Sequence, residues 1–125
     1  MSENYSDLAH PIEITLPPYI PENIGQAAVA IGSDTAAPAN NAFAGGWQAK
    51  APGSNSFAFG GTNGAEKDPK ITQAIANNAI AIGGGVTASG QYAFASGFET
   101  VASGIASHAE SRSTTGSGGC SHAEG

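Results

Sequence analysis

The chain repeats itself every 14 residues, and this period decides what it can fold into. Seven segments share the pattern small-x-Ala-x-Gly, and they start at positions 28, 42, 56, 79, 93, 107 and 121. Every step is 14 residues except that from Ser56 to Ala79, which is 23, or 14 plus nine. Only Ser111 replaces glycine at the fifth position. A fixed period of this kind predicts stacked structural units rather than one globular core.

Within each segment, small residues alternate with larger ones. In Ala79-Ile80-Ala81-Ile82-Gly83, the first, third and fifth residues face one side of a strand, and the second and fourth face the other. A face of small residues suits a narrow interior, where two strands of one coil lie close together. We therefore expect an all-β parallel β-solenoid with 14-residue coils, each containing two short strands and two turns. Glycines are expected at the corners, where positive φ or close backbone approach is needed.

The two faces predict an interior and an interface. The interior is expected to be lined by the third-position alanines, Ala30, Ala44, Ala58, Ala81, Ala95, Ala109 and Ala123. The other face carries large apolar residues first and His-Glu pairs last: Val29, Ile31, Phe43, Phe57, Phe59, Ile80, Ile82, Phe94, His108, Glu110, His122 and Glu124. A soluble monomer rarely exposes a contiguous apolar patch of this length. We therefore predict that identical chains bury this stripe about a shared axis.

Several segments resemble a known family. NAIAIGG at 78–84 and YAFASG at 92–97 are similar to the head repeats of trimeric autotransporter adhesins. SHAEG at 121–125 is especially similar to repeats of phage tail-fibre, appendage and head-fibre proteins. The resemblance covers residues 27–125, and the nine-residue insertion departs from it. It implies a left-handed parallel β-roll, assembled as a homotrimer, that serves as the shaft or head of an adhesive fibre.

Residues 1–26 lie outside the repeat and form a separate segment. They hold four of the seven prolines, four acidic residues and no Lys or Arg. Proline favours extended backbone, so this segment is expected to be an extended anchor that docks on a larger particle. The alternative is an unstructured tail. The residues predicted to attach are Ile12, Ile14, Leu16, Pro17, Pro18, Tyr19 and Ile20.

The repeat domain, residues 27–125, contains the insertion at about 61–71. This stretch is polar and Gly-rich, and it holds two of the three lysines. We expect a solvated surface loop, because insertions in solenoids emerge as loops on one face. A loop that contacts a partner is the alternative.

Composition excludes several classes of protein. Leu, Ile, Val and Phe number only 20 of 125 residues, too few for a compact core of ordinary kind. A net charge of -6 with four Lys plus Arg argues against nucleic-acid binding. One cysteine cannot form an internal disulfide. No apolar run approaches the roughly 18 residues of a membrane span, and no signal peptide is evident.

The sequence predicts no catalytic site, no metal and no cofactor. His108 and His122 are each followed two residues later by a glutamate, and we interpret these pairs as polar layers that set chain register. Rings of such residues around a shared axis could alternatively bind an anion or a metal. Cys120 near His122 could suggest a thiol dyad, but a small filler equivalent to Ala106 is the favoured interpretation.

These features favour a non-enzymatic structural protein, a phage tail fibre or head fibre. It would be made in the host cytoplasm and exposed on the virion, with residues 1–26 bound to a tail or capsid protein. The shaft would project towards the host, and a host receptor would be bound by parts beyond Gly125, since the repeat ends there without a cap. The head domain of a bacterial trimeric surface adhesin is the alternative.

Overall fold

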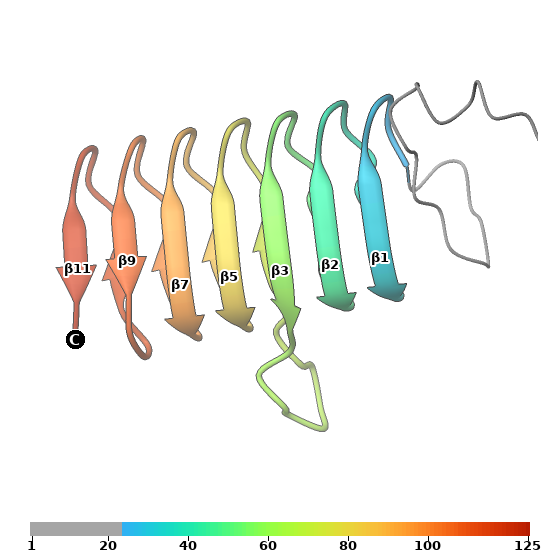
Figure 1. The fold of residues 1–125 in the computed structure, drawn as a ribbon. Helices are drawn as coiled ribbons and strands as arrows, with labels where there is room; N and C mark the ends of the chain where they lie inside the picture. Colours follow the sequence, from blue (N-terminus) through green and yellow to red (C-terminus); the bar gives the residue numbers. More distant parts are fainter. Residues whose placement is uncertain (1–23) are drawn as a thin grey trace, which may run out of the picture.

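Residues 24–125, the part of the chain that the computed structural model describes, wind into a stack of coils (Figure 1). One strand per coil joins a seven-stranded parallel sheet in the order β1-β2-β3-β5-β7-β9-β11. Its strands are β1 (Val29–Ser33), β2 (Phe43–Trp47), β3 (Phe57–Gly61), β5 (Ile80–Gly84), β7 (Phe94–Phe98), β9 (His108–Glu110) and β11 (His122–Glu124). This arrangement confirms the predicted all-β solenoid with 14-residue coils.

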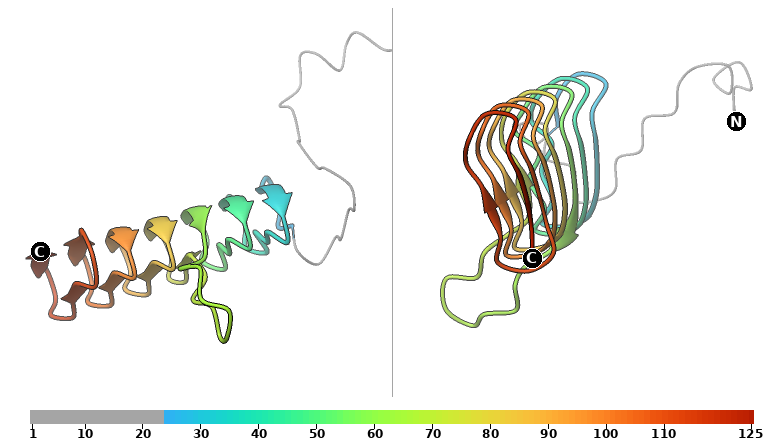
Figure 2. Two further views of the ribbon diagram at one scale, coloured as in Figure 1. Left: turned by 90° about the horizontal axis from the view of Figure 1, so that it is seen from below. Right: turned by 90° about the vertical axis from the view of Figure 1, so that its left-hand side faces the viewer.

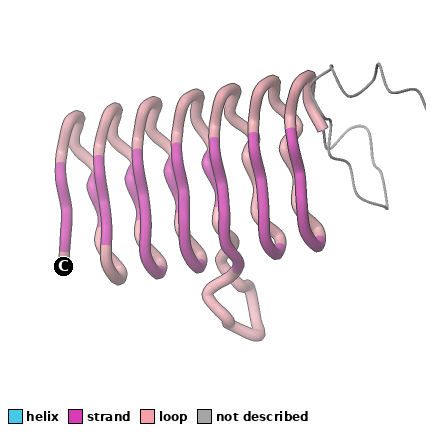
Figure 3. Tube along the Cα trace, viewed as in Figure 1, coloured by secondary structure: helices cyan, strands magenta, loops and turns pink. Residues whose placement is uncertain are grey.

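A second parallel sheet closes each coil on the other side (Figure 3). Its order is β10-β8-β6-β4, and its two-residue strands are β4 (Gln73–Ala74), β6 (Thr87–Ala88), β8 (Val101–Ala102) and β10 (Thr115–Gly116). Single parallel bridges at Ala36, Lys50 and Gln73 continue the pairing into the first coils. Seen along the stack, the coils are flattened and superimpose closely (Figure 2).

Strict register follows from the repeat. Ala44 pairs with Ala58 and Ala81 pairs with Ala95, so equivalent residues of successive coils lie side by side. Period-two alternation then puts every third-position alanine on one face of the seven-stranded sheet. Within the described residues no helix has the length and apolar character that a membrane crossing requires.

The space between the two sheets is filled almost entirely by alanine. Ala44, Ala58, Ala81, Ala95 and Ala109 are fully buried, and Ala30 and Ala123 in the end coils are half-buried. The facing wall is also alanine: Ala37, Ala51, Ala74, Ala88 and Ala102, all at zero exposure. A methyl group is all that this gap accepts, which explains why a chain so poor in large apolar residues still has a dry core.

One interior position in each of three coils holds a larger residue: Thr72, Val86 or Thr100, 14 residues apart and each fully buried. The Thr72 hydroxyl lies 2.9 Å from the carbonyl oxygens of both Gly61 and Gly83, and it accepts a bond from the Val86 amide at 3.3 Å. Val86 occupies the same column as the two threonines, so this position accepts a β-branched side chain. At Thr72 the added hydroxyl also donates to a backbone carbonyl oxygen.

The turns confirm the expectation that glycines mark the corners only in part: Gly53, Gly90 and Gly104 each begin a turn where the backbone of the next coil lies close, but glycine supplies few of the positive φ values at the turns. Two corners per coil do adopt a left-handed conformation, but other residues occupy most of them, for example Asn41, Asn78 and Glu99 with φ near 60°. Asparagine and aspartate tolerate this region better than most residues, which accounts for part of the pattern. The fifth-position glycines instead lie within the seven-stranded sheet, where successive backbones approach closely.

The nine-residue insertion leaves the stack after β3 as a single projecting loop (Figure 1). An antiparallel bridge between Thr62 and Ile71 closes its base. Asn63 holds the neck, because its side-chain oxygen accepts from the Lys70 amide at 3.0 Å and its amide group donates to the Glu99 carboxylate at 2.6 Å. The coil therefore resumes in register beyond the loop.

Candidate binding face

The seven-stranded sheet turns one face away from the core, and we call this the outer face. The second residue of each strand-forming segment makes its first column: Val29, Phe43, Phe57, Ile80, Phe94, His108 and His122. The fourth residue makes its second column: Ile31, Gly45, Phe59, Ile82, Ser96, Glu110 and Glu124. All twelve residues of the predicted interface stripe therefore lie on this one face.

The first five coils make the apolar part of the outer face. Phe43 and Phe57 stack with ring centroids 4.8 Å apart and planes 7° from parallel. Phe59 is 49 % exposed and Ile82 is 37 % exposed. Because large side chains stay partly exposed in successive coils, they form a continuous apolar surface.

Gly45 and Ser96 interrupt the second column and are absent from the predicted stripe. A methyl group on Gly45 would meet the rings of Phe59 and Phe43 at 3.0–3.2 Å. The two rings thus lean over the glycine and fill the gap that it leaves. Alternation alone could not reveal this, because it depends on side-chain direction across neighbouring coils.

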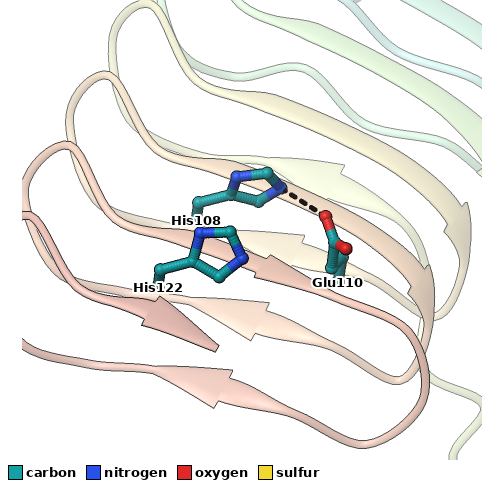
Figure 4. Close-up of side chains that lie close together, drawn as sticks. All are labelled: His108, Glu110 and His122. Atoms are coloured by element: carbon teal, nitrogen blue, oxygen red, sulfur yellow. Dashed lines mark ion pairs between the residues drawn. The ribbon is translucent and has the colours of Figure 1, made fainter. Parts of the chain in front are cut away.

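The last two coils make the polar part of the outer face. His108 Nε2 lies 3.0 Å from Glu110 Oε1, and His122 Nε2 lies 3.0 Å from Glu124 Oε1. The His108 ring touches Phe94 edge-on at 5.0 Å and lies 4.6 Å from the His122 ring. The aromatic column therefore continues from Phe94 into the two histidines. Figure 4 shows His108 and His122 side by side, with Glu110 facing His108.

The position of Cys120 shows that its interpretation as a small filler of the interior is wrong. It is exposed and adopts φ 58°, as Ala106 does with φ 58°. The two positions are equivalent, but both lie at a left-handed turn rather than in the interior. No hydrogen bond between described residues joins the Cys120 thiol to His122.

Of the other exposed large residues, Trp47 lies at the end of β2 in the seven-stranded sheet, and the remaining three lie outside that sheet. Tyr92 and Ile105 are each 62 % exposed and lie in the turns that precede β7 and β9. Ile75 follows β4 of the second sheet and is 41 % exposed. The outer face is distinguished from these single residues by continuity, since its large side chains recur in neighbouring coils.

The residues predicted to attach to a particle, Ile12 to Ile20, lie outside the described residues. Among residues 24–125 one group of side chains could hold a metal ion, His108 with Glu110 and His122. The outer face therefore combines an apolar part with one polar cluster.

Comparison with known protein families agrees with this architecture. A model described as the YadA head domain repeat, in two copies, matches residues 24–49, 46–63 and 74–99. These segments cover β1 to β3, β5 and β7, more than half of the chain, and they leave out the two His-Glu coils. No curated protein and no solved structure is significantly similar to the chain.

Proposed function

The chain belongs to the family of YadA head domain repeats, and from this premise we propose that it forms the trimeric, non-enzymatic head of a surface adhesin. The observation that supports the proposal most is the apolar part of the outer face. Heads of this family resemble the chain in sequence and are trimeric in the adhesins that carry them. A second and a third copy are therefore the natural cover for Phe57, Phe59 and Ile82.

The physical argument for self-association is the free-energy cost of leaving the apolar part of the outer face in water. Burying apolar surface yields roughly 25 cal/mol for each Å². The partly exposed apolar side chains of the first five coils offer this surface, most of all Phe59 and Ile82. Closed cyclic symmetry satisfies all copies equally and leaves no stripe free to form open filaments. The in-register columns make the surface repeat with the coils, so three copies can match along their whole length.

A single substitution that introduces a charge on the outer face tests trimer formation. Ile82→Glu is expected to give a folded monomer, because in a trimer the three carboxylates would be buried without partners, which costs several kcal/mol each. In a single chain Ile82 is already 37 % exposed, so the coil itself tolerates the change. Sedimentation equilibrium, with circular dichroism to check the fold, measures the outcome.

Ile105→Glu is the matched control, since Ile105 is 62 % exposed and lies at a turn away from the outer face. It is expected to remain trimeric. A wild-type chain that stays monomeric at high concentration would contradict the proposal, and so would an Ile82→Glu variant that stays trimeric.

Two carriers of the head are considered, a bacterial cell surface and a virion. The family match favours a bacterial cell surface. The second candidate is the virion fibre, favoured by the similarity of the segments at 107–111 and 121–125 to phage fibre repeats, which lie outside the matched residues. In that case residues 1–26 would attach to a tail or capsid protein. For both candidates the target is a host-surface receptor, and a net charge of -6 disfavours nucleic acid.

Antibody labelling separates the two locations. Gold-labelled antibody against the chain is expected to decorate the outside of intact bacteria under the electron microscope. Label that is found instead on purified phage particles from the same culture would contradict the adhesin and support the virion fibre. Cells with the gene deleted provide the control.

A further inference from the structure

The two coils outside the family match bring four polar side chains together on the outer face. We propose that His108, Glu110 and His122 form a binding site for a divalent transition-metal ion of the zinc type, within one chain. This revises the interpretation of the histidines as register-setting layers alone. The site needs no second copy, so it does not depend on the proposed trimer.

The sheet geometry creates the cluster. His122 pairs with His108 and Glu124 with Glu110, in parallel register. Residues two apart on a strand share a face, and adjacent strands lie about 4.8 Å apart. Two His-x-Glu segments in successive coils therefore make a grid with imidazoles in one column and carboxylates in the other.

The distances suit a metal of small radius. One donor atom from each of His108, Glu110 and His122 falls within 4.8 Å of the others. In a tetrahedral zinc site, arms of about 2.0–2.2 Å separate the ligand atoms by roughly 3.3 Å. Rotation of two exposed side chains closes the difference, since the His108 and Glu110 side chains are 38 % and 42 % exposed.

The imidazole of His108 has an unused donor atom. Its Nε2 is shielded from solvent and makes no aligned hydrogen bond to any described residue, although Glu110 Oε1 lies 3.0 Å away. A shielded nitrogen 3.0 Å from a carboxylate oxygen can form an ion pair with it or, after a small rotation, share a cation with it. Mixed nitrogen and oxygen donors, with a fourth position for water, are typical of zinc and its neighbours rather than of calcium or magnesium.

Glu124 has a supporting role. Its Oε1 hydrogen-bonds His122 Nε2 at 3.0 Å. A carboxylate that holds a ligating histidine fixes the ring orientation and raises its basicity. We assign Glu124 as a positioning residue for the His122 ring.

A metal at this place would tie β9 to β11 through side chains. β9 has only three residues, and glycine is replaced by Ser111 directly after it, so this end of the sheet has fewer ladder bonds than β3 to β7. An ion held by two coils compensates for that loss. The metal would therefore make the distal part of the outer face rigid.

The test is a titration of the full chain with Zn²⁺ by isothermal calorimetry, with metal-free chain as the starting material. One ion per chain is expected. His108→Gln and His122→Gln should each weaken binding by more than about tenfold, the smallest loss seen even for residues that only orient a ligand, and Glu124→Gln by about tenfold. Co²⁺ in place of Zn²⁺ should give the visible absorption of a tetrahedral site, and this signal should vanish in both histidine variants.

Controls keep the result specific. His10→Gln removes the third histidine of the chain and Glu66→Gln an exposed carboxylate of the loop, and both should bind as the wild type does. Circular dichroism shows whether each variant is folded. His108→Phe, which extends the column from Phe94, is a second test should the glutamine variants unfold. Three outcomes would overturn the proposal: no binding by the wild type, equal binding by the histidine variants, or one ion per three chains.

Discussion

Replacing Gly60 with alanine is expected to cost about 4 kcal/mol of unfolding free energy, enough to abolish a cooperative transition in a small solenoid. Gly60 is the fifth residue of its segment and adopts φ 144°, a conformation that side chains rarely take. A methyl group there would collide with the carbonyl oxygen of Gly83, well inside 3.0 Å. Because the obstacle is backbone that also pairs with the next coil, neither side can move away.

Gly61→Ala is the matched control at the next position. A methyl group on Gly61 would meet only the Trp47 carbonyl oxygen at 4.0 Å, and its φ lies outside the left-handed region. Its change in stability is expected to stay within about 1 kcal/mol. Urea unfolding followed by far-ultraviolet circular dichroism compares the two variants. Equal midpoints would show that the glycine column has no steric role.

The column of fifth-position glycines contains one natural exception. Ser111 replaces glycine with φ 92°, and strand β9 just before it has three residues where β7 has five. Gly97, one coil earlier, would meet the Ser111 carbonyl oxygen if it carried a methyl group, so the close approach persists on that side. The shortened strand is what a side chain in the column is expected to produce.

Ala81→Leu is expected to destabilise the chain by about 3 kcal/mol, with distortion of at least two coils. Ala81 has no exposed surface and belongs to the same buried cluster as Val86 and Ala88. The interior is only as wide as opposed methyl groups allow, and three additional carbon atoms must push the two sheets apart. The neighbouring coils oppose this displacement, because β3 and β7 are hydrogen-bonded to the strand of Ala81 in the same parallel sheet.

Ile82→Leu, on the next residue of the same strand, is the control, and its effect should stay below about 1.5 kcal/mol. Ile82 points to the outer face and not between the two sheets, so a change of its shape does not push the sheets apart. Thermal melting at equal protein concentration measures both variants. If Ala81→Leu melts with the wild type, the interior must be wider than the structure shows.

Sequence alone was sufficient for the regular parts of the fold. The 14-residue period and the alternation of Ala81 with Ile80 and Ile82 predicted a parallel solenoid, its small-residue interior and the residues that share its outer face. These conclusions follow from strand geometry, because a period of two is a property of every extended backbone. The family match then agreed with the resemblance to adhesin heads, whereas nothing beyond the two SHAE segments favours the phage fibre.

The candidate site was only partly predictable. That His108 and Glu110 share a face follows from their spacing. Whether His122 lies close enough to join them depends on the register between coils and on the directions of three side chains. The exposure of Cys120 was missed, because a small residue in a repeat can line an interior or sit at a turn with equal ease.

By itself, the sequence determined the repeat unit, the strand direction and the division into a face of methyl groups and a face of larger side chains. The tertiary structure decided which positions carry the left-handed turns, how Phe43 and Phe59 cover Gly45, and how near the two His-Glu coils bring their donor atoms. The reason is physical. Alternation is local to one strand, but contacts between coils depend on the exact stacking of backbones, which only the folded stack defines.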